Sequence, residues 1–326
     1  MKFGVREICD VTFKTTADNQ KVGKTTFAKA GTPAFFIDTA TTSSLEQATT
    51  TVYAQGGRGY SRLIAWEGEK TMTFTIEDAL ISPMGLAVLS GAGLMNASAD
   101  NLRHVHVTLV KNFSEGKAKV SYEDLLDELG LAEAEAASLH VCNTTEAPIY
   151  GIVVDGSGAG VAYLQSVTVA SGAESPSDPA YKNTIKITKD ESAEFTLGGE
   201  DSVGFENATV KLDFYILMDS SVTEVTIAPE DFGGYFYIEA QTLFRREDTG
   251  KDMAAEIIIP KAKVQSGFTF TMAASGDPST FTFTIDALPG YTMFDKTKKL
   301  MCAIQMIGTD KLGGADATGA HDHSSF

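Results

Sequence analysis

The stretch Lys70-Thr71-Met72-Thr73-Phe74-Thr75-Ile76 alternates strictly between polar and apolar side chains. Successive side chains of a β-strand point to opposite faces of the sheet, so this pattern predicts a strand with Met72, Phe74 and Ile76 on one buried face. A short apolar run at residues 256–259 is expected to stop at Pro260, which has no N–H to donate to a ladder. The same alternation predicts strands at residues 104–110, 184–188, 208–217, 222–227, 235–244, 267–272 and 280–285. The sequence therefore predicts a mainly β, antiparallel architecture.

Helical signals are fewer. Ser82 followed by Pro83 is typical of an N-cap with proline in the first turn, and it predicts one or two turns of helix. Residues 121–129 predict a stronger helix, because Ser121 can cap it, acidic residues fill its first turn and Gly130 can end it. A third short helix is expected at residues 132–139 from propensity alone.

Charge is distributed unevenly along the 326 residues. The chain carries 26 Lys and Arg against 43 Asp and Glu, a net charge of −17, which argues against a general nucleic-acid-binding surface. Residues 115–206 hold 17 acidic and 5 basic side chains, together with the loosest Gly-, Ser- and Pro-rich sequence. We therefore predict a discontinuous β domain of residues 1–111 and 208–310, interrupted by an acidic α+β module at residues 112–207 and followed by a flexible tail at 311–326.

The cysteines and the apolar segments indicate the cellular compartment in which the protein is expected. Cys9, Cys142 and Cys302 are odd in number and far apart, so they predict neither a disulfide framework nor a metal-binding motif, and they fit a reducing compartment. The N-terminus lacks the apolar core of a secretory signal, and 18 apolar residues never run together. We expect no membrane-spanning segment.

Motifs for catalysis or cofactor binding are weak. Gly23-Lys24-Thr25-Thr26 lacks the upstream glycine of a phosphate loop, since Asp18 stands there, and predicts a hairpin turn. The glycine-rich residues 156–160 follow an apolar run, but a second strand rather than a helix is expected after them, which favours a hairpin loop over a dinucleotide site. His104 and His106 share a strand face and could chelate a metal, yet no third ligand is apparent. We expect no catalytic residues, no metal and no cofactor.

A polar, glycine-rich segment suggests an interface instead. Tyr53-Ala54-Gln55-Gly56-Gly57-Arg58-Gly59-Tyr60-Ser61-Arg62 combines glycines with arginine and tyrosine, the side chains enriched at interface anchors. A plain surface loop remains the alternative. The favoured interpretation is a subunit contact.

Two stretches of the chain resemble the tail tube (major tail) proteins of tailed bacteriophages. The first runs from Thr51-Val52-Tyr53-Ala54-Gln55-Gly56-Gly57-Arg58-Gly59 through residues 66–83, and the second comprises residues 237–240, 245–251, 259–264 and 275–281. The resemblance covers about a third of the chain. It implies a β-sandwich or half-barrel that completes a β-barrel only in a ring, usually a hexamer, with the rings stacked into a tube. The acidic insertion departs from the minimal fold of such subunits.

Several expectations follow from the resemblance. It implies a structural protein of the virion tail, made in the host cytoplasm, whose partners are further copies of itself and other tail proteins such as a sheath, baseplate or terminator. DNA would pass through the lumen without specific binding, so lumen-facing side chains should be acidic or neutral. Alternatives are a capsid-surface or baseplate component, or a carbohydrate-binding or hydrolytic β domain. The expected subunit-interface residues are Arg58, Tyr60, Arg62, Arg245 and Arg246.

Overall fold

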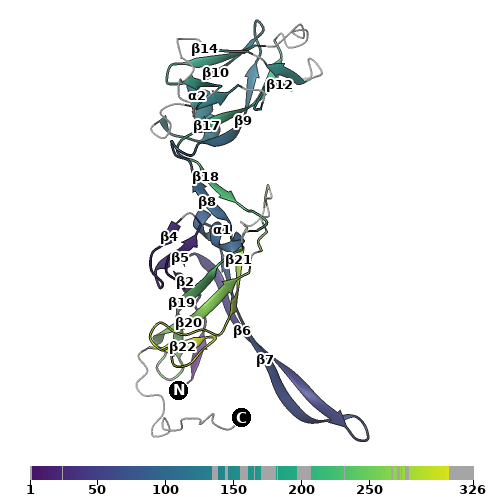
Figure 1. The fold of residues 1–326 in the computed structure, drawn as a ribbon, viewed down its shortest axis with the longest axis vertical. Helices are drawn as coiled ribbons and strands as arrows, with labels where there is room; N and C mark the ends of the chain where they lie inside the picture. The colour runs from purple at the N-terminus through teal and green to yellow at the C-terminus, as the bar shows by residue number, and fades with distance from the viewer. Residues whose placement is uncertain are drawn as a thin grey trace. The chain divides into compact units, whose positions relative to one another are not determined.

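The computed structural model describes all residues except 1, 24, 134–138, 144–145, 155–160, 165, 170–180, 182, 197–206, 231, 266, 270–271, 273, 276–278 and 308–326. The chain divides into two compact units: unit 1 comprises Met1–Met95 and Val225–Phe326, and unit 2 comprises Asn96–Glu224 (Figure 1). Both are built mainly from antiparallel strands, which confirms the predicted fold class. Strands β8 (Gly93–Asn96) and β18 (Thr223–Thr226) pair where the chain passes between the units.

Unit 1 is built around one antiparallel sheet with the strand order β5-β2-β19-β20-β21-β7-β6, to which β1 adds beside β19 and β22 beside β20. Strands β5 and β6 end this order on opposite sides, yet only two residues join them in the chain. The sheet must therefore curve until its two ends approach, although β5 and β6 do not pair with each other in the described part. The elements of unit 1 are β1 (Phe3–Val5), β2 (Asp10–Thr15), β3 (Gln20–Val22), β4 (Thr25–Phe27), β5 (Pro33–Ile37), β6 (Ala40–Gly56), β7 (Ser61–Asp78), α1 (Pro83–Ser90), β19 (Tyr235–Arg246), β20 (Asp252–Val264), β21 (Phe281–Ala287) and β22 (Ala303–Met306).

The core of unit 1 lies on the concave side of this sheet. Phe13, Phe74, Phe236 and Phe283 come from four different strands, and all are at most 2% exposed. The rings of Phe13 and Phe236 meet edge to face, with their centroids 5.8 Å apart. The apolar face predicted from residues 70–76 is thus the buried one, with Ile76 fully covered.

The described residues of unit 2 form two antiparallel sheets and one helix around a separate core. The smaller sheet has the order β10-β16-β14; the larger has the order β13-β12-β17-β11-β15, with β9 also beside β17. Both sheets and α2 contribute buried residues, among them Leu125, Phe195 and Phe214. The elements of unit 2 are β9 (Arg103–Asn112), β10 (Lys117–Ser121), α2 (Tyr122–Leu129), β11 (Leu139–Cys142), β12 (Ile149–Val153), β13 (Val161–Leu164), β14 (Ser166–Val169), β15 (Thr184–Ile187), β16 (Ser192–Thr196) and β17 (Thr209–Met218).

The helices predicted after Ser82 and at residues 121–129 are both confirmed at their ends. The Ser82 hydroxyl accepts a hydrogen bond from the Gly85 N–H at 3.0 Å and caps α1. Ser121 and Asp124 form a reciprocal capping box at the start of α2, and Gly130 ends it with a φ of 65°. These caps satisfy backbone groups that the first and last helical turns leave without partners.

Three secondary-structure predictions need correction. Strand β20 does not stop at Pro260 but continues to Val264. Pro260 lies opposite Tyr237, where the pairing with β19 shifts its register, so the ladder requires no N–H donor at this position. No strand forms in the described part of residues 267–272, and Phe268 packs against the core from an irregular segment. Leu139 begins strand β11 rather than ending a helix; residues 134–138 lie outside the described part.

The compact division also differs from the predicted limits of the insertion. Unit 2 begins at Asn96 and ends at Glu224, outside the predicted limits of 112 and 207. Strands β9 and β17, which the charge pattern assigned to the flanking domain, pair with each other along their whole length inside unit 2. These two strands carry few charged side chains, so the charge pattern did not assign them to the acidic module. The charge of a segment does not determine which sheet the segment joins. The predicted tail at 311–326 lies outside the described residues.

Candidate subunit interface

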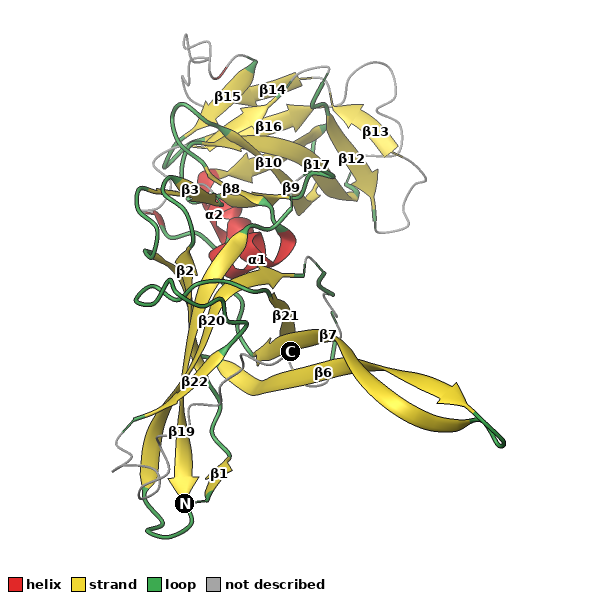
Figure 2. Cartoon of the chain, turned by 60° about the horizontal axis from the view of Figure 1, so that its bottom comes forward, coloured by secondary structure: helices red, strands yellow, loops and turns green. Residues whose placement is uncertain are grey.

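Strands β6 and β7 continue as a two-stranded ribbon beyond the rest of the sheet of unit 1 (Figures 1 and 2). We call residues 46–71 the distal hairpin. All of its residues are exposed except Ala54 and Gly56, which are half-buried. An isolated two-stranded ribbon is at best marginally stable in water, so contact with another surface would stabilise this hairpin.

One face of the distal hairpin is apolar. Val52 pairs with Trp66 and Ala54 with Ile64, so these four side chains share a face. The exposed fractions of Val52, Ile64 and Trp66 are 63%, 55% and 53%. A contiguous exposed apolar face of this kind marks an interaction site on a water-soluble surface.

The predicted residues Arg58, Tyr60 and Arg62 lie together at the tip of this hairpin. Gly57, Gly59 and Tyr60 adopt positive φ angles of 81°, 92° and 54°, which turn the chain sharply between the two strands. Tyr60 is 78% exposed, and the Arg62 guanidinium lies 4.2 Å from the centre of the Tyr53 ring. The tip therefore presents cationic and aromatic groups to the solvent.

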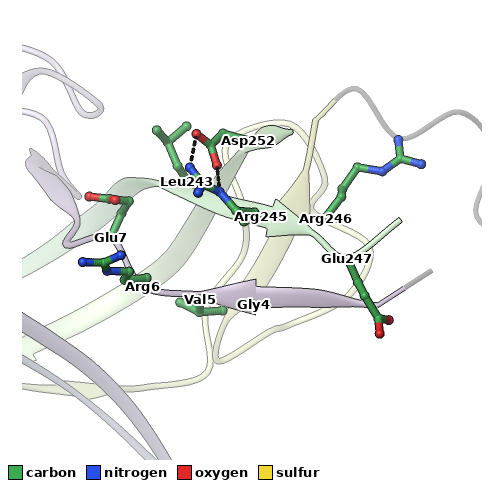
Figure 3. Close-up of a pocket in the computed structure, with 9 residues that line it drawn as sticks. All are labelled: Gly4, Val5, Arg6, Glu7, Leu243, Arg245, Arg246, Glu247 and Asp252. Atoms are coloured by element: carbon green, nitrogen blue, oxygen red, sulfur yellow. Dashed lines mark hydrogen bonds and ion pairs between the residues drawn. The ribbon is translucent and has the colours of Figure 1, made fainter. Parts of the chain in front are cut away.

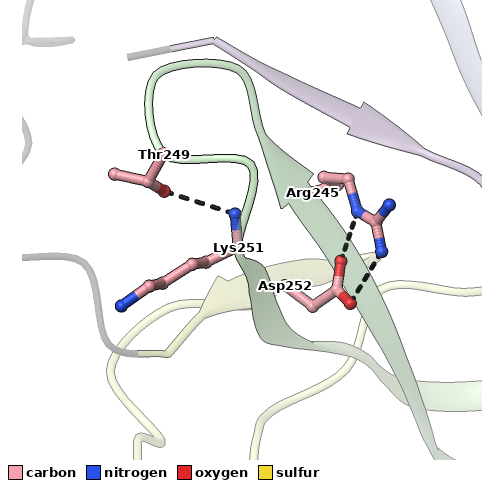
Figure 4. A network of polar contacts seen from close by, with 4 residues as sticks. All are labelled: Arg245, Thr249, Lys251 and Asp252. Atoms are coloured by element: carbon pink, nitrogen blue, oxygen red, sulfur yellow. Dashed lines mark hydrogen bonds and ion pairs between the residues drawn. The ribbon is translucent and has the colours of Figure 1, made fainter.

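Arg245 and Arg246 lie elsewhere in unit 1, at the turn between β19 and β20. Arg245 forms two parallel hydrogen bonds to the Asp252 carboxylate, at 2.7 and 2.9 Å (Figure 4). Arg246 makes the same kind of pair with Asp248, at 2.9 and 2.7 Å. These hydrogen bonds lower the pKa of both carboxyls. The structure thus does not bring the two predicted arginine clusters together, and a role for Arg245 and Arg246 between subunits stays a prediction.

A pocket of about 400 Å³ adjoins this turn (Figure 3). Val5, Leu243 and Arg245 line it, with Arg6 and Glu7 at its rim. Close by, the ring of Phe3 stacks on Phe244 with the centroids 5.1 Å apart. Sequence reasoning missed this surface, because it depends on the N-terminal strand β1 pairing with β19, more than two hundred residues away.

The motifs that resembled phosphate-, dinucleotide- or metal-binding sites lie in ordinary strands and turns of the described part. Gly23 turns the hairpin between β3 and β4, as predicted; Lys24 lies outside the described residues. Strands β12 and β13 pair directly on either side of the glycine-rich loop, which favours the hairpin interpretation, although residues 156–160 themselves are not described. His106 Nε2 lies 2.9 Å from an Asp213 oxygen, and the described residues include no group of three or more metal-binding side chains.

The cysteines are separate thiols. Burial raises the pKa values of Cys142 and Cys302 to about 11, so both are protonated at neutral pH. Among the helices described, none has the length and apolarity needed to cross a bilayer.

The described residues thus form a mainly β protein whose distal hairpin carries an exposed apolar face. The model of the YomU/Tube protein family matches residues 19–300, and the chain belongs to this family. The match supports the resemblance to phage tail tube proteins, a structural class. No curated protein matches the chain.

Proposed function

We propose that the chain polymerises as stacked, hexameric rings that form the tail tube through which the phage genome is delivered. The observation that carries this proposal is the distal hairpin, whose apolar face with Val52, Ile64 and Trp66 has no cover from its own unit. A second copy of the chain would bury that face. Family membership supports the tail tube as the setting, in the virion and in the host cytoplasm during assembly.

The open sheet of unit 1 supports the same proposal. In the described part of the chain, β6 pairs only with β7, which leaves the backbone groups along its other edge without a strand partner. Long exposed edges invite pairing with another chain. Heterologous contacts of this kind close into a ring when the rotation between subunits permits.

Electron microscopy of the purified protein at high concentration tests the proposal. Hollow tubes or six-fold rings are the expected result, and discrete monomers at every concentration would contradict it. DNA added to the tubes at low salt should not co-sediment, because a conduit for genome passage must not hold the phosphate backbone. No catalytic step is part of this function.

Unit 2 is proposed to be an inserted module that assembly does not need. The cores of the two units share no residue. The ends of the insertion lie together, since the Ala97 N–H donates a hydrogen bond to the Val222 carbonyl at 2.8 Å. Residues 96–224 carry 21 acidic and 8 basic side chains, so their removal also removes most of the net charge.

Replacing residues 98–221 with a short Gly-Ser turn is expected to leave unit 1 folded and able to polymerise. The physical reason is that a domain inserted between adjacent strand ends contributes no core to its host. Circular dichroism and electron microscopy check folding and tube formation. A shortened chain that is unfolded would show that unit 2 is not an independent insertion.

A further inference from the structure

A second apolar surface of unit 1 has no cover in the described chain. Ile8, Leu243 and Ile307 are 40%, 43% and 56% exposed, and together with Ala254 they line a groove of about 460 Å³. The strand pairing explains their proximity: Leu243 lies opposite Ala254, and the Ile307 N–H donates to the Ala254 carbonyl at 2.8 Å. We call this surface the Leu243 groove.

The Leu243 groove is rimmed by acidic side chains. Glu7, Asp10 and Glu256 line it, and Gln241 pairs with Asp10 on one side and with Glu256 on the other. Burial, and then the neighbouring Glu239 carboxylate, raise the pKa of Glu256, while Lys14, which forms an ion pair with Glu239, acts in the opposite direction. An arriving cation would relieve this concentration of negative charge.

The groove continues into the pocket beside β1, since Glu7 and Leu243 line both. Arg245 faces that second pocket but is already held by Asp252 (Figure 3). Arg6 also lines the second pocket. Glu7 lines both pockets and lies near Arg245, whereas Asp10 and Glu256 line the Leu243 groove and not the pocket that holds these arginines.

The tip of the distal hairpin has complementary properties. Between residues 47 and 66, Arg58 and Arg62 are the charged residues, and both are positive. Arg58 lies in the turn that joins the two strands, next to the apolar face with Val52, Ile64 and Trp66. Arg62 pairs with Gln55 and lies over the Tyr53 ring, on the opposite face of the ribbon. The hairpin and the groove are both apolar, and the charged side chains at their edges have opposite signs, so the two surfaces are complementary.

We propose that the Leu243 groove of one subunit receives the distal hairpin of a second copy, with Arg58 against Asp10 and Glu256. This rests on the proposed function and names the surface that accepts the hairpin. The distal hairpin extends beyond the strands of its own sheet, so it does not turn back onto its own groove. Figure 2 shows the hairpin running away from β19.

Disulfide trapping between two forms of the full chain tests this docking. One form carries Ile64→Cys, the other carries Leu243→Cys and a distinguishing tag, and Cys302→Ser in both removes the cysteine that is not fully buried. The two forms are assembled together and oxidised with copper phenanthroline. The expected result is a disulfide-linked pair containing one chain of each form, at least tenfold above the control.

The control pairs Ile64→Cys with Phe36→Cys, a strand position of unit 1 that is also apolar and 53% exposed. Val52→Cys on the same hairpin face provides a second donor and should also link to Leu243→Cys. Tubes that form with cross-linking no higher than the control would overturn the docking and leave the proposed function standing. Absence of tubes from the parent chain under all conditions would overturn both.

Discussion

Replacing Trp66 with serine is expected to prevent tube formation at concentrations at which the parent chain polymerises, while the thermal unfolding of the monomer stays unchanged. Trp66 is 53% exposed in the single chain, and nothing in the described part packs over that exposed portion. Burying it against a neighbour contributes about 2–3 kcal/mol per contact, so its loss raises the critical concentration roughly 30- to 150-fold. Sedimentation across a concentration series measures the change.

Val110→Ser is the matched control for Trp66→Ser. Val110 is also an apolar strand residue, 60% exposed, but it lies on β9 of unit 2. Its replacement should shift the critical concentration less than twofold. Equal polymerisation of the Trp66→Ser and parent chains would remove the hairpin face from the proposed interface. A lowered melting temperature of the Trp66→Ser monomer would show a role in folding instead.

Local chemistry in the sequence predicted much of the fold. Two kinds of signal depend only on residues close in sequence: the alternation around Phe74 and Ile76, and the helix caps at Ser82 and Ser121. They could therefore be recognised without knowledge of the partner strands. Pro260 misled because its effect depends on a register shift in β19, which no local pattern records. The compact units have other limits than the predicted insertion for a similar reason, since strand pairing over about a hundred residues decides them.

The candidate interface was only half visible in the sequence. Arg58, Tyr60 and Arg62 stood out because they lie among glycines, and because Arg and Tyr are enriched at interface anchors. Ile64 and Trp66 did not, because period-two alternation looks the same whether the apolar face meets its own core or another copy. Burial in the three-dimensional structure separates these cases: Phe74 is 1% exposed and Trp66 53%.

Unit 2 should lose stability in acid because of one buried histidine. His140 on β11 is 6% exposed, and its ring stacks on Tyr181 with the centroids 3.8 Å apart. Burial, and then the positive charge of Lys186, lower the pKa of His140 to about 4, while Asp219 acts in the opposite direction. In the unfolded chain the same imidazole titrates near a pKa of about 6.5.

The sign of the pH dependence follows from these two pKa values. Below about pH 6.5 His140 binds a proton in the unfolded chain, but in the folded unit it does so only near pH 4. Protonation therefore favours the unfolded chain, and the free energy of unfolding, at its full value above about pH 6.5, decreases as the pH falls towards 4. The loss by pH 4.5 is about 2–3 kcal/mol. Denaturant unfolding at pH 7 and pH 4.5 measures it.

Two histidine variants separate this effect from the titration of carboxylates. His140→Phe keeps an aromatic ring beside Tyr181 but cannot bind a proton, so its stability should fall about 2–3 kcal/mol less than that of the parent between pH 7 and pH 4.5. His104→Gln replaces an exposed histidine of the same unit and should lose as much stability as the parent. If the parent and His140→Phe instead lose the same free energy of unfolding over this pH range, His140 is protonated in the folded unit already at neutral pH, or it is accessible to water. Either result would contradict a buried, neutral imidazole.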